Sequence, residues 1–196
     1  MYIVKKNIRT IGIDDAAFQR GKSSKTFVFG VVVRGHTLVE GILRTDVEID
    51  GINASERISE MITGSKFHDQ LKAIFLGSST IAAFNVIDFN LLYEQTSLPT
   101  ISILSVLPDN KEVKNALSHL PDWEKRLAIL SSNPPIKKIS FVNQSGRNFN
   151  MYVQYIGFDE IKDVERILQI STYSSSIPEC LRLADLIGRS FQSFIM

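Results

Sequence analysis

The first half of the chain alternates hydrophobic and polar positions with the short period that is typical of β-strands. Three such segments follow one another, and the second is almost continuously apolar, as expected for a strand in the middle of a sheet. Gly35 and His36 form a turn signal between the second and third segments. The pattern predicts an antiparallel meander of three strands at residues 8–14, 26–34 and 38–49.

Beyond residue 50 the period changes, and apolar positions recur at helical spacing. Predicted helices alternate here with short apolar strands, an order that implies parallel pairing through right-handed crossovers. The predicted helices span residues 55–62 and 85–96, and the predicted strands span residues 72–76 and 99–104.

The last third of the chain contains a clear break at Asn133-Pro134-Pro135. Two helices are predicted before the break, and a strand pair followed by two helices is predicted after it. Their ranges are 110–117, 122–130, 136–142, 148–156, 159–170 and 178–194. We find no internal repeat and no long linker, so we expect a single domain over residues 1–196.

This order of elements is that of an α/β, ribonuclease H-like mixed sheet: three antiparallel strands, then parallel strands, with helices on both faces. In that arrangement the first strand lies between the meander and the parallel half. The ends of the first and fourth strands then lie side by side, where open α/β sheets form their ligand crevice. Asp14 and Asp15 end the first strand, Asp50 ends the third, and residues 77–80 follow the fourth.

Carboxylates gathered in such a crevice suit a hard divalent cation. Mg²⁺ and Mn²⁺ prefer oxygen ligands, and one or two such ions can assist the hydrolysis of a phosphodiester. Asp14, Asp15 and Asp50 are the candidate metal ligands, Asp14 and Asp50 are the candidate catalytic residues, and Asp15 would assist. Strand alternation would place Asp46 and Glu48 on the same face as Asp50. The alternative is that these aspartates only cap backbone amides or form turns.

Polar residues after the fourth strand are candidates for ligand binding. Ser78, Ser79 and Thr80 could cradle an anion with their hydroxyls and backbone amides. Their loop lacks the lysine and spacing of a P-loop, so a plain connection is the alternative. Asn85 could form a polar lip on the crevice, or Asn85 and Asp88 could cap a helix.

Charge gives no global attraction to nucleic acid or to an acidic membrane, because 22 basic residues face 21 acidic ones and the net charge is +1. Residues 1–44 nevertheless carry eight basic and three acidic side chains. This segment could face phosphates, or it could simply be the solvated part of strands and loops. Nucleic acid is therefore a candidate partner, a membrane is not, and the oligomeric state is open, a homodimer included.

Cys180 is the single cysteine, so no internal disulfide can form, which fits a reducing cytoplasm. It lies in an apolar helical run, and we expect it to be a small buried hydrophobic residue. The N-terminus has no hydrophobic signal core. The longest apolar stretch, residues 27–33, is too short to cross a bilayer, so we expect a cytoplasmic protein.

Several short motifs spread over residues 8 to 190 resemble one archaeal family of uncharacterised proteins, called domain of unknown function ninety-nine. That family is in turn distantly similar to endonuclease V, which cuts nucleic acid near deaminated bases with a divalent metal. The motifs are Gly12-Ile13-Asp14-Asp15, Val31-Val32-Val33-Arg34-Gly35, Asp50-Gly51-Ile52-Asn53, Ala83-Phe84-Asn85-Val86, Leu98-Pro99-Thr100 and Pro178-Glu179-Cys180-Leu181.

The resemblance implies that Asp14 is a metal ligand and that Asp50 is a second one. It also implies a third ligand, an aspartate directly after the next parallel strand, where this chain has Gly77. Asn53 stands where an aspartate is expected, and no histidine follows the fourth strand. The resemblance thus favours a nucleic-acid-binding or nucleotide-binding domain with a depleted acidic metal site. The alternative is an active divalent-metal-dependent phosphodiesterase or nuclease.

Overall fold

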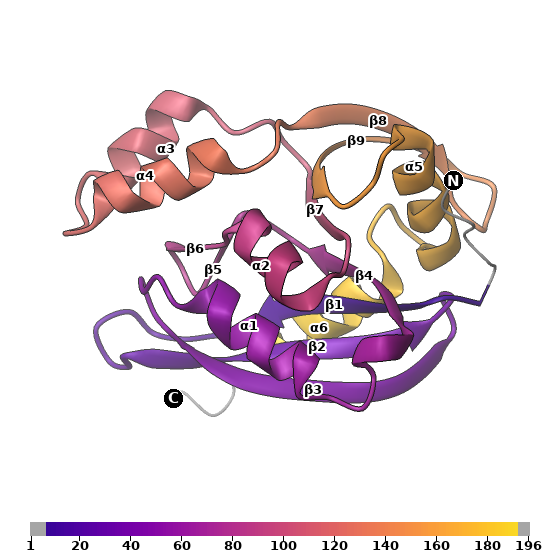
Figure 1. The fold of residues 1–196 in the computed structure, drawn as a ribbon, viewed down its shortest axis with the longest axis horizontal. Coiled ribbons are helices and arrows are strands. Elements are labelled where there is room, and N and C mark those ends of the chain that lie inside the picture. Colours follow the sequence, from indigo (N-terminus) through magenta and orange to yellow (C-terminus); the bar gives the residue numbers. More distant parts are fainter. Residues whose placement is uncertain (1–6, 192–196) are drawn as a thin grey trace.

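The computed structural model describes residues 7–191, which form a seven-stranded mixed sheet with the strand order β3-β2-β1-β4-β7-β9-β8 (Figure 1). The strands are β1 (Arg9–Asp15), β2 (Lys25–Arg34), β3 (Leu38–Glu48), β4 (Leu71–Leu76), β7 (Thr100–Leu104), β8 (Lys137–Val142) and β9 (Asn148–Ile156). A separate small hairpin consists of β5 (Thr80–Ile81) and β6 (Asn85–Val86). The helices are α1 (Ala54–Thr63), α2 (Phe89–Thr96), α3 (Asn110–Leu117), α4 (Trp123–Ser132), α5 (Ile161–Ser171) and α6 (Glu179–Ser190), with a 3₁₀ turn at His68–Gln70.

Strand β1 is an interior strand of this sheet, and it joins the antiparallel meander to the parallel strands. It is antiparallel to β2, which is antiparallel to β3, and it is parallel to β4, which is parallel to β7. Strands β9 and β8 complete the sheet in antiparallel orientation. The predicted meander and the predicted parallel strands are therefore confirmed, and the carboxyl ends of β1 and β4 lie side by side.

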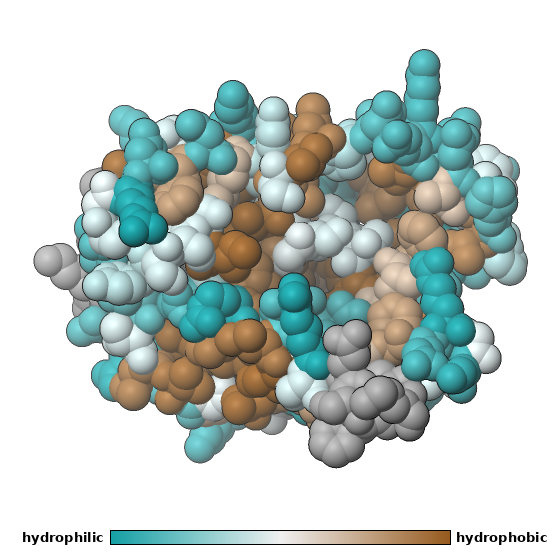
Figure 2. Space-filling view, turned by 180° about the vertical axis from the view of Figure 1, so that it is seen from behind, coloured by the Kyte–Doolittle hydropathy of each residue, from teal (hydrophilic) through white to brown (hydrophobic). Residues whose placement is uncertain are grey.

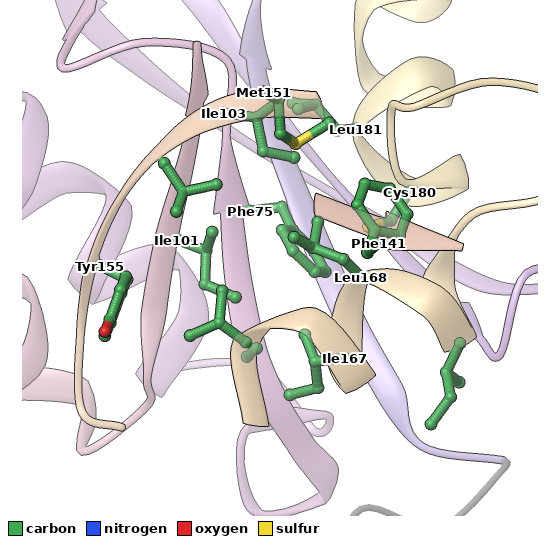
Figure 3. Close-up of a cluster of buried hydrophobic side chains, with 14 of the residues drawn as sticks. Phe75, Ile101, Ile103, Phe141, Met151, Tyr155, Ile167, Leu168, Cys180 and Leu181 are labelled. Atoms are coloured by element: carbon green, nitrogen blue, oxygen red, sulfur yellow. The ribbon is translucent and has the colours of Figure 1, made fainter. Parts of the chain in front are cut away.

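Helices cover both faces of the sheet, as predicted. Helices α1 and α2 lie in front of it in Figure 1, where Ile58, Ile62, Phe89 and Leu92 pack against apolar strand residues. Helices α5 and α6 cover the other face, where a second cluster includes Phe75, Phe141, Leu168 and Cys180 (Figure 3). Cys180 is a free, buried cysteine, in agreement with its predicted role.

Helix α6 lies against β1 at a distance that only glycine allows. A Cβ atom at Gly12 would lie 2.2 Å from the backbone nitrogen of Leu181, and one at Gly188 would lie 2.1 Å from the carbonyl oxygen of Asp15. Real Cβ atoms do not make contacts this short, since the cost of overpacking rises steeply. The two glycines therefore place the first turn and the last turns of α6 directly behind the strand that carries Asp14 and Asp15.

The prediction of one helix over residues 85–96 was wrong in its first part. Residues 85–86 form β6, and α2 begins only at Phe89. Asp88 is the N-cap, and its carboxylate accepts hydrogen bonds from the backbone amides of Asn90 and Leu91. Asn85 is buried within the hairpin and belongs to it, so the predicted capping pair divides between two elements.

The prediction that Asp50 ends the third strand and continues its alternation was also wrong. Strand β3 ends at Glu48, and Asp50 adopts a left-handed backbone conformation with φ of 55°. Asp50 therefore does not continue the alternation of Asp46 and Glu48. For the last helix, α6 spans Glu179–Ser190, and Phe194 of the predicted range lies outside the described residues.

The surface is mixed in character. On the face opposite to that of Figure 1, hydrophobic side chains emerge between hydrophilic ones (Figure 2). Exposed large hydrophobic residues include Leu38, Val39 and Ile42 on β3, an edge strand of the sheet. Over residues 7–191, no helix has the length and apolar character needed to cross a bilayer.

Candidate functional site

A pocket of about 240 Å³ opens where β1 and β4 end side by side. Asp14, Asp15, Gly77, Ser78 and Thr80 are among the residues that line it. Both predicted parts of the site, the aspartate pair after the first strand and the loop after the fourth, thus meet in one place. We call this the acidic pocket.

The two aspartates of the acidic pocket sit where their charge is disfavoured. Burial raises the pKa of Asp14 to about 7, and repulsion from Asp15 and from Asp185 adds to this effect. The backbone amide of Asp15 donates to Oδ1 of Asp14 over 3.0 Å, which opposes the rise in pKa. Burial also raises the pKa of Asp15, against the lowering effect of the backbone amide of Ala82.

Asp185 of α6 is an acidic neighbour that the sequence analysis missed. It contributes to the raised pKa of both Asp14 and Asp15, and its own carboxylate accepts a hydrogen bond from Arg189 over 2.6 Å. The sequence predicted a helix at residues 178–194 but not which strand that helix meets. The close approach at Gly188 is what brings Asp185 near the end of β1.

Asp50 has a different environment from the aspartate pair. Its Oδ1 accepts hydrogen bonds from the backbone amide of Phe84 over 3.0 Å and from Arg20 over 3.4 Å. Among residues 7–191, no three His, Cys, Asp or Glu side chains gather closely enough to hold a metal ion. The structure therefore does not bring Asp14, Asp15 and Asp50 together as one such group, and their role as metal ligands stays a prediction.

Of the four predicted binding residues after β4, Ser78, Ser79, Thr80 and Asn85, only two line the acidic pocket. Ser78 and Thr80 line the acidic pocket, with their hydroxyl oxygens 3.4 Å apart. Ser79 instead donates to Oε1 of Gln154 over 2.7 Å. Asn85 is fully buried, and its amide links the hairpin to the backbone of Ala54 and Glu48.

A larger and mainly apolar pocket of about 440 Å³ adjoins the acidic one, and the two share Ser78 and Thr80. Phe84, Leu104 and Val113 contribute to its lining, so it lies between the β4–β5 loop and the α3–α4 hairpin. The acidic pocket therefore has apolar surface beside it.

Much of the basic excess of residues 1–44 is committed to internal contacts. Four of these basic side chains form ion pairs: Arg9 and Arg34 with Glu40, Lys25 with Asp46, and Arg20 with Asp50. The guanidinium of Arg44 lies over the ring of Phe27. Lys5 and Lys6 lie outside the described residues. The hypothesis of a basic face for phosphates therefore draws little support from these side chains.

Arg126 of α4 is a second residue that the sequence analysis missed. Its side chain is buried, with 3% of its surface exposed. Its guanidinium donates to the carbonyl oxygens of Asp50, Gly51 and Phe84 over 2.5, 2.5 and 2.6 Å. These acceptors are 42 to 76 positions away in sequence, so no local pattern could have revealed them.

The donor set of the acidic pocket fits a hard divalent cation. Asp14 and Asp15 offer carboxylate oxygens whose charge is disfavoured by burial and by the nearby carboxylate of Asp185, which a cation would relieve. Ser78 and Thr80 offer neutral oxygens next to them. Mg²⁺ in particular is often held by one or two carboxylates, with water and substrate phosphate completing its shell.

Comparison with known proteins gives relatives over nearly the whole chain. A UPF0215 protein of Methanosarcina mazei is 39% identical over 186 residues, which cover 94% of this chain and 91% of the relative. A protein of unknown function from Archaeoglobus fulgidus has a crystal structure that matches with a TM-score of 0.80 and 30% identity, covering 92% of this chain and 96% of that one.

Endonuclease V of Ciona intestinalis, solved with a 24mer DNA containing an inosine followed by a ribo-adenosine, matches with a TM-score of 0.61. The identity is 14%, and the match covers 97% of this chain and 88% of that chain, which shows a shared fold. The expected relation to endonuclease V is thus confirmed at the level of the fold. A family model described as Endonuclease dU matches residues 6–192, and the chain therefore belongs to the Endonuclease dU family.

Proposed function

We propose that this protein is a divalent-metal-dependent endonuclease that acts on DNA containing deoxyuridine. The observation that carries the proposal is the Asp14–Asp15 pair in a pocket at the carboxyl ends of β1 and β4. This is the place where open α/β sheets bind their ligands. The description of the family, Endonuclease dU, supplies the reaction and the nucleotide to test first.

In this proposal Asp14 and Asp15 hold Mg²⁺ or Mn²⁺. When bound, such a cation stabilises charge that develops on the phosphate oxygens during cleavage. Asp14 releases its proton as it becomes a ligand, so binding of the cation is favoured by rising pH. The hydroxyls of Ser78 and Thr80 can donate to a phosphate beside the carboxylates. The larger apolar pocket offers space for a base next to that phosphate.

A second candidate function is nucleic-acid binding without cleavage. It is favoured by Gly77, which brings no carboxylate to a position of the acidic pocket where one was expected. The absence of a three-ligand cluster among residues 7–191 points the same way. The two candidates share the binding surface and differ in whether the pocket holds a metal that supports hydrolysis.

Titration with Mn²⁺ and Mg²⁺ by calorimetry, followed by cleavage assays on labelled duplexes, separates the candidates. The duplexes carry deoxyuridine, inosine or no altered base, and the variants are Asp14→Asn and Asp69→Asn. Asp69 has a fully exposed side chain and serves as the matched control. We expect wild type and Asp69→Asn to bind the metal and cut the deoxyuridine duplex, and Asp14→Asn to do neither. DNA binding without metal binding or cleavage would leave the second candidate.

A further inference from the structure

Two loops beside the acidic pocket are held in conformations that most residues avoid. Asp50 has φ of 55°, and in the turn of the β5–β6 hairpin Ala82 and Ala83 have φ of 48° and 69°. Left-handed backbone is disfavoured for residues with a Cβ atom. Such conformations persist only where the surrounding structure fixes them.

The two loops are tied to each other and to the aspartate pair. The backbone amide of Asp50 donates to the carbonyl oxygen of Ala82 over 3.0 Å, and the amide of Phe84 donates to Oδ1 of Asp50 over 3.0 Å. The amide of Ala82 in turn stabilises the Asp15 carboxylate. A shift of the hairpin turn therefore changes the surroundings of Asp15.

The side chain of Arg126 connects the two loops to helix α4. Its guanidinium donates to carbonyl oxygens on both loops, those of Asp50 and Gly51 on one side and that of Phe84 on the other. A planar guanidinium presents several donors in a fixed geometry, which suits it to clamp several acceptors at once. Asp122, the acidic side chain that pairs with Arg126, lies 3.9 Å away and is half exposed.

We infer that Arg126 is a positioning residue, through which α4 fixes the Asp50–Gly51 loop and the β5–β6 turn and thereby shapes the acidic pocket. The α3–α4 hairpin thus sets the geometry of a site to which it contributes no carboxylate. Asn133, just after α4, strengthens the same attachment, since its side chain bonds to the backbone of Ile87 and Phe89. The metal-binding part of this inference rests on the proposed function; the loop-holding part does not.

Amide hydrogen exchange and Mn²⁺ affinity, measured on Arg126→Ala and Arg126→Lys, test the inference. In Arg126→Ala we expect faster exchange at the amides of Asp50 and Phe84, with protection retained in β2. We expect the Mn²⁺ dissociation constant to rise by up to about tenfold, the lower end of the loss seen when a residue that supports a metal site is removed, because Arg126 acts on Asp15 through the loops. Methylguanidinium at millimolar concentration should restore both properties in Arg126→Ala by refilling the site between the three carbonyls.

Arg57→Lys is the matched control. Arg57 also donates to a backbone carbonyl, that of Asp46, but it does not bond to either loop. We expect this variant to leave the exchange of Asp50 and Phe84 and the Mn²⁺ affinity unchanged. If Arg126→Ala does not fold, Arg126→Lys, which keeps one cationic donor, gives the same comparison.

Uniform loss of protection along the chain, or exchange at Asp50 and Phe84 that does not change, would overturn the inference. So would a rescued exchange pattern without rescued Mn²⁺ affinity, because the pocket would then be independent of the loops. Failure of the proposed function is distinct from these outcomes. In that case wild-type protein binds no Mn²⁺, while the exchange data still decide whether Arg126 holds the loops.

Discussion

Asp14 is a carboxylic acid in a place that disfavours its charged form. Burial and the neighbouring carboxylates lift its pKa from 3.8 to about 7. Arg189 donates a hydrogen bond to Asp185. This bond, and to a smaller extent the charge of Asp14, raises the pKa of Arg189. The acidic pocket therefore stores unfavourable electrostatic free energy in the ligand-free protein, which metal binding would relieve.

The first prediction concerns stability as a function of pH. Between pH 4 and pH 7 the folded state keeps the Asp14 proton that the unfolded state has released, so rising pH lowers the free energy of unfolding. Asp14→Asn removes this penalty. We expect the variant to be more stable than wild type at pH 8, with the difference shrinking toward pH 4.

Urea unfolding curves at several pH values measure this difference, with Asp69→Asn as control. An Asp14→Asn variant that is less stable than wild type at pH 8 would contradict the prediction. Saturating Mn²⁺ should raise the melting temperature of wild type more than that of the variant, since a ligand stabilises only the state that binds it.

The second prediction restores the carboxylate that the acidic pocket lacks. A Cβ atom at Gly77 meets nothing within 4 Å, and its backbone is not left-handed, so a side chain fits there. Gly77→Asp should tighten Mn²⁺ binding on the order of tenfold, or about 1.4 kcal/mol. Gly77→Asn, which has the same shape without the charge, should show no such gain in calorimetric titration. Equal affinities of the two variants would place Gly77 out of reach of the metal.

At the scale of elements, the spacing of apolar positions predicted the meander, the parallel strands and most helices. This pattern shows which face of a segment is buried. For these segments, the spacing of apolar residues within the segment was enough to identify that face. The helix predicted at residue 85 failed because Asn85 and Val86 pair with β5 in a hairpin whose turn contains two left-handed alanines. Alanine in that conformation leaves no signal in the sequence.

The acidic pocket was predictable only in part for a related reason. Asp14 and Asp15 could be found because they end a central strand. Asp185 and Arg126 could not, since each acts on residues far away in the sequence and each lies in a helix where a charged residue ordinarily faces water. The positions of such residues follow from packing between elements, which one sequence does not show.

The third prediction tests the contact between α6 and β1. In Gly12→Ala the new methyl group would overlap the backbone of Cys180 and Leu181. Backbone cannot move aside as a flexible side chain can, so we expect a loss of about 3 kcal/mol in the free energy of unfolding. Gly77→Ala, whose methyl group meets open space, is the control. Chemical denaturation of both variants decides, and equal stabilities would show that α6 can shift away from β1 at little cost.

At the scale of the whole molecule, the single thiol reports on the attachment of α6. Burial raises the pKa of Cys180 to about 12, so the reactive thiolate is scarce and shielded in the folded state. The fourth prediction is that a thiol reagent labels Cys180 only through opening events that free α6 from the sheet. The labelling rate should rise with urea and should be faster in Gly12→Ala. Rapid labelling that does not respond to urea would show that Cys180 is accessible without such opening.

The contact between β1 and α6 also governs when the site can exist at all. Thr10 and Cys180, which lie 3.4 Å apart in the fold, are separated by 170 positions in the chain. During synthesis β1 leaves the ribosome before α6 does, and it stays without this covering helix until the residues between them have been translated. A chain that ends between these positions therefore carries both aspartates without Asp185 beside them, and the face of β1 that α6 covers in the complete fold stays exposed.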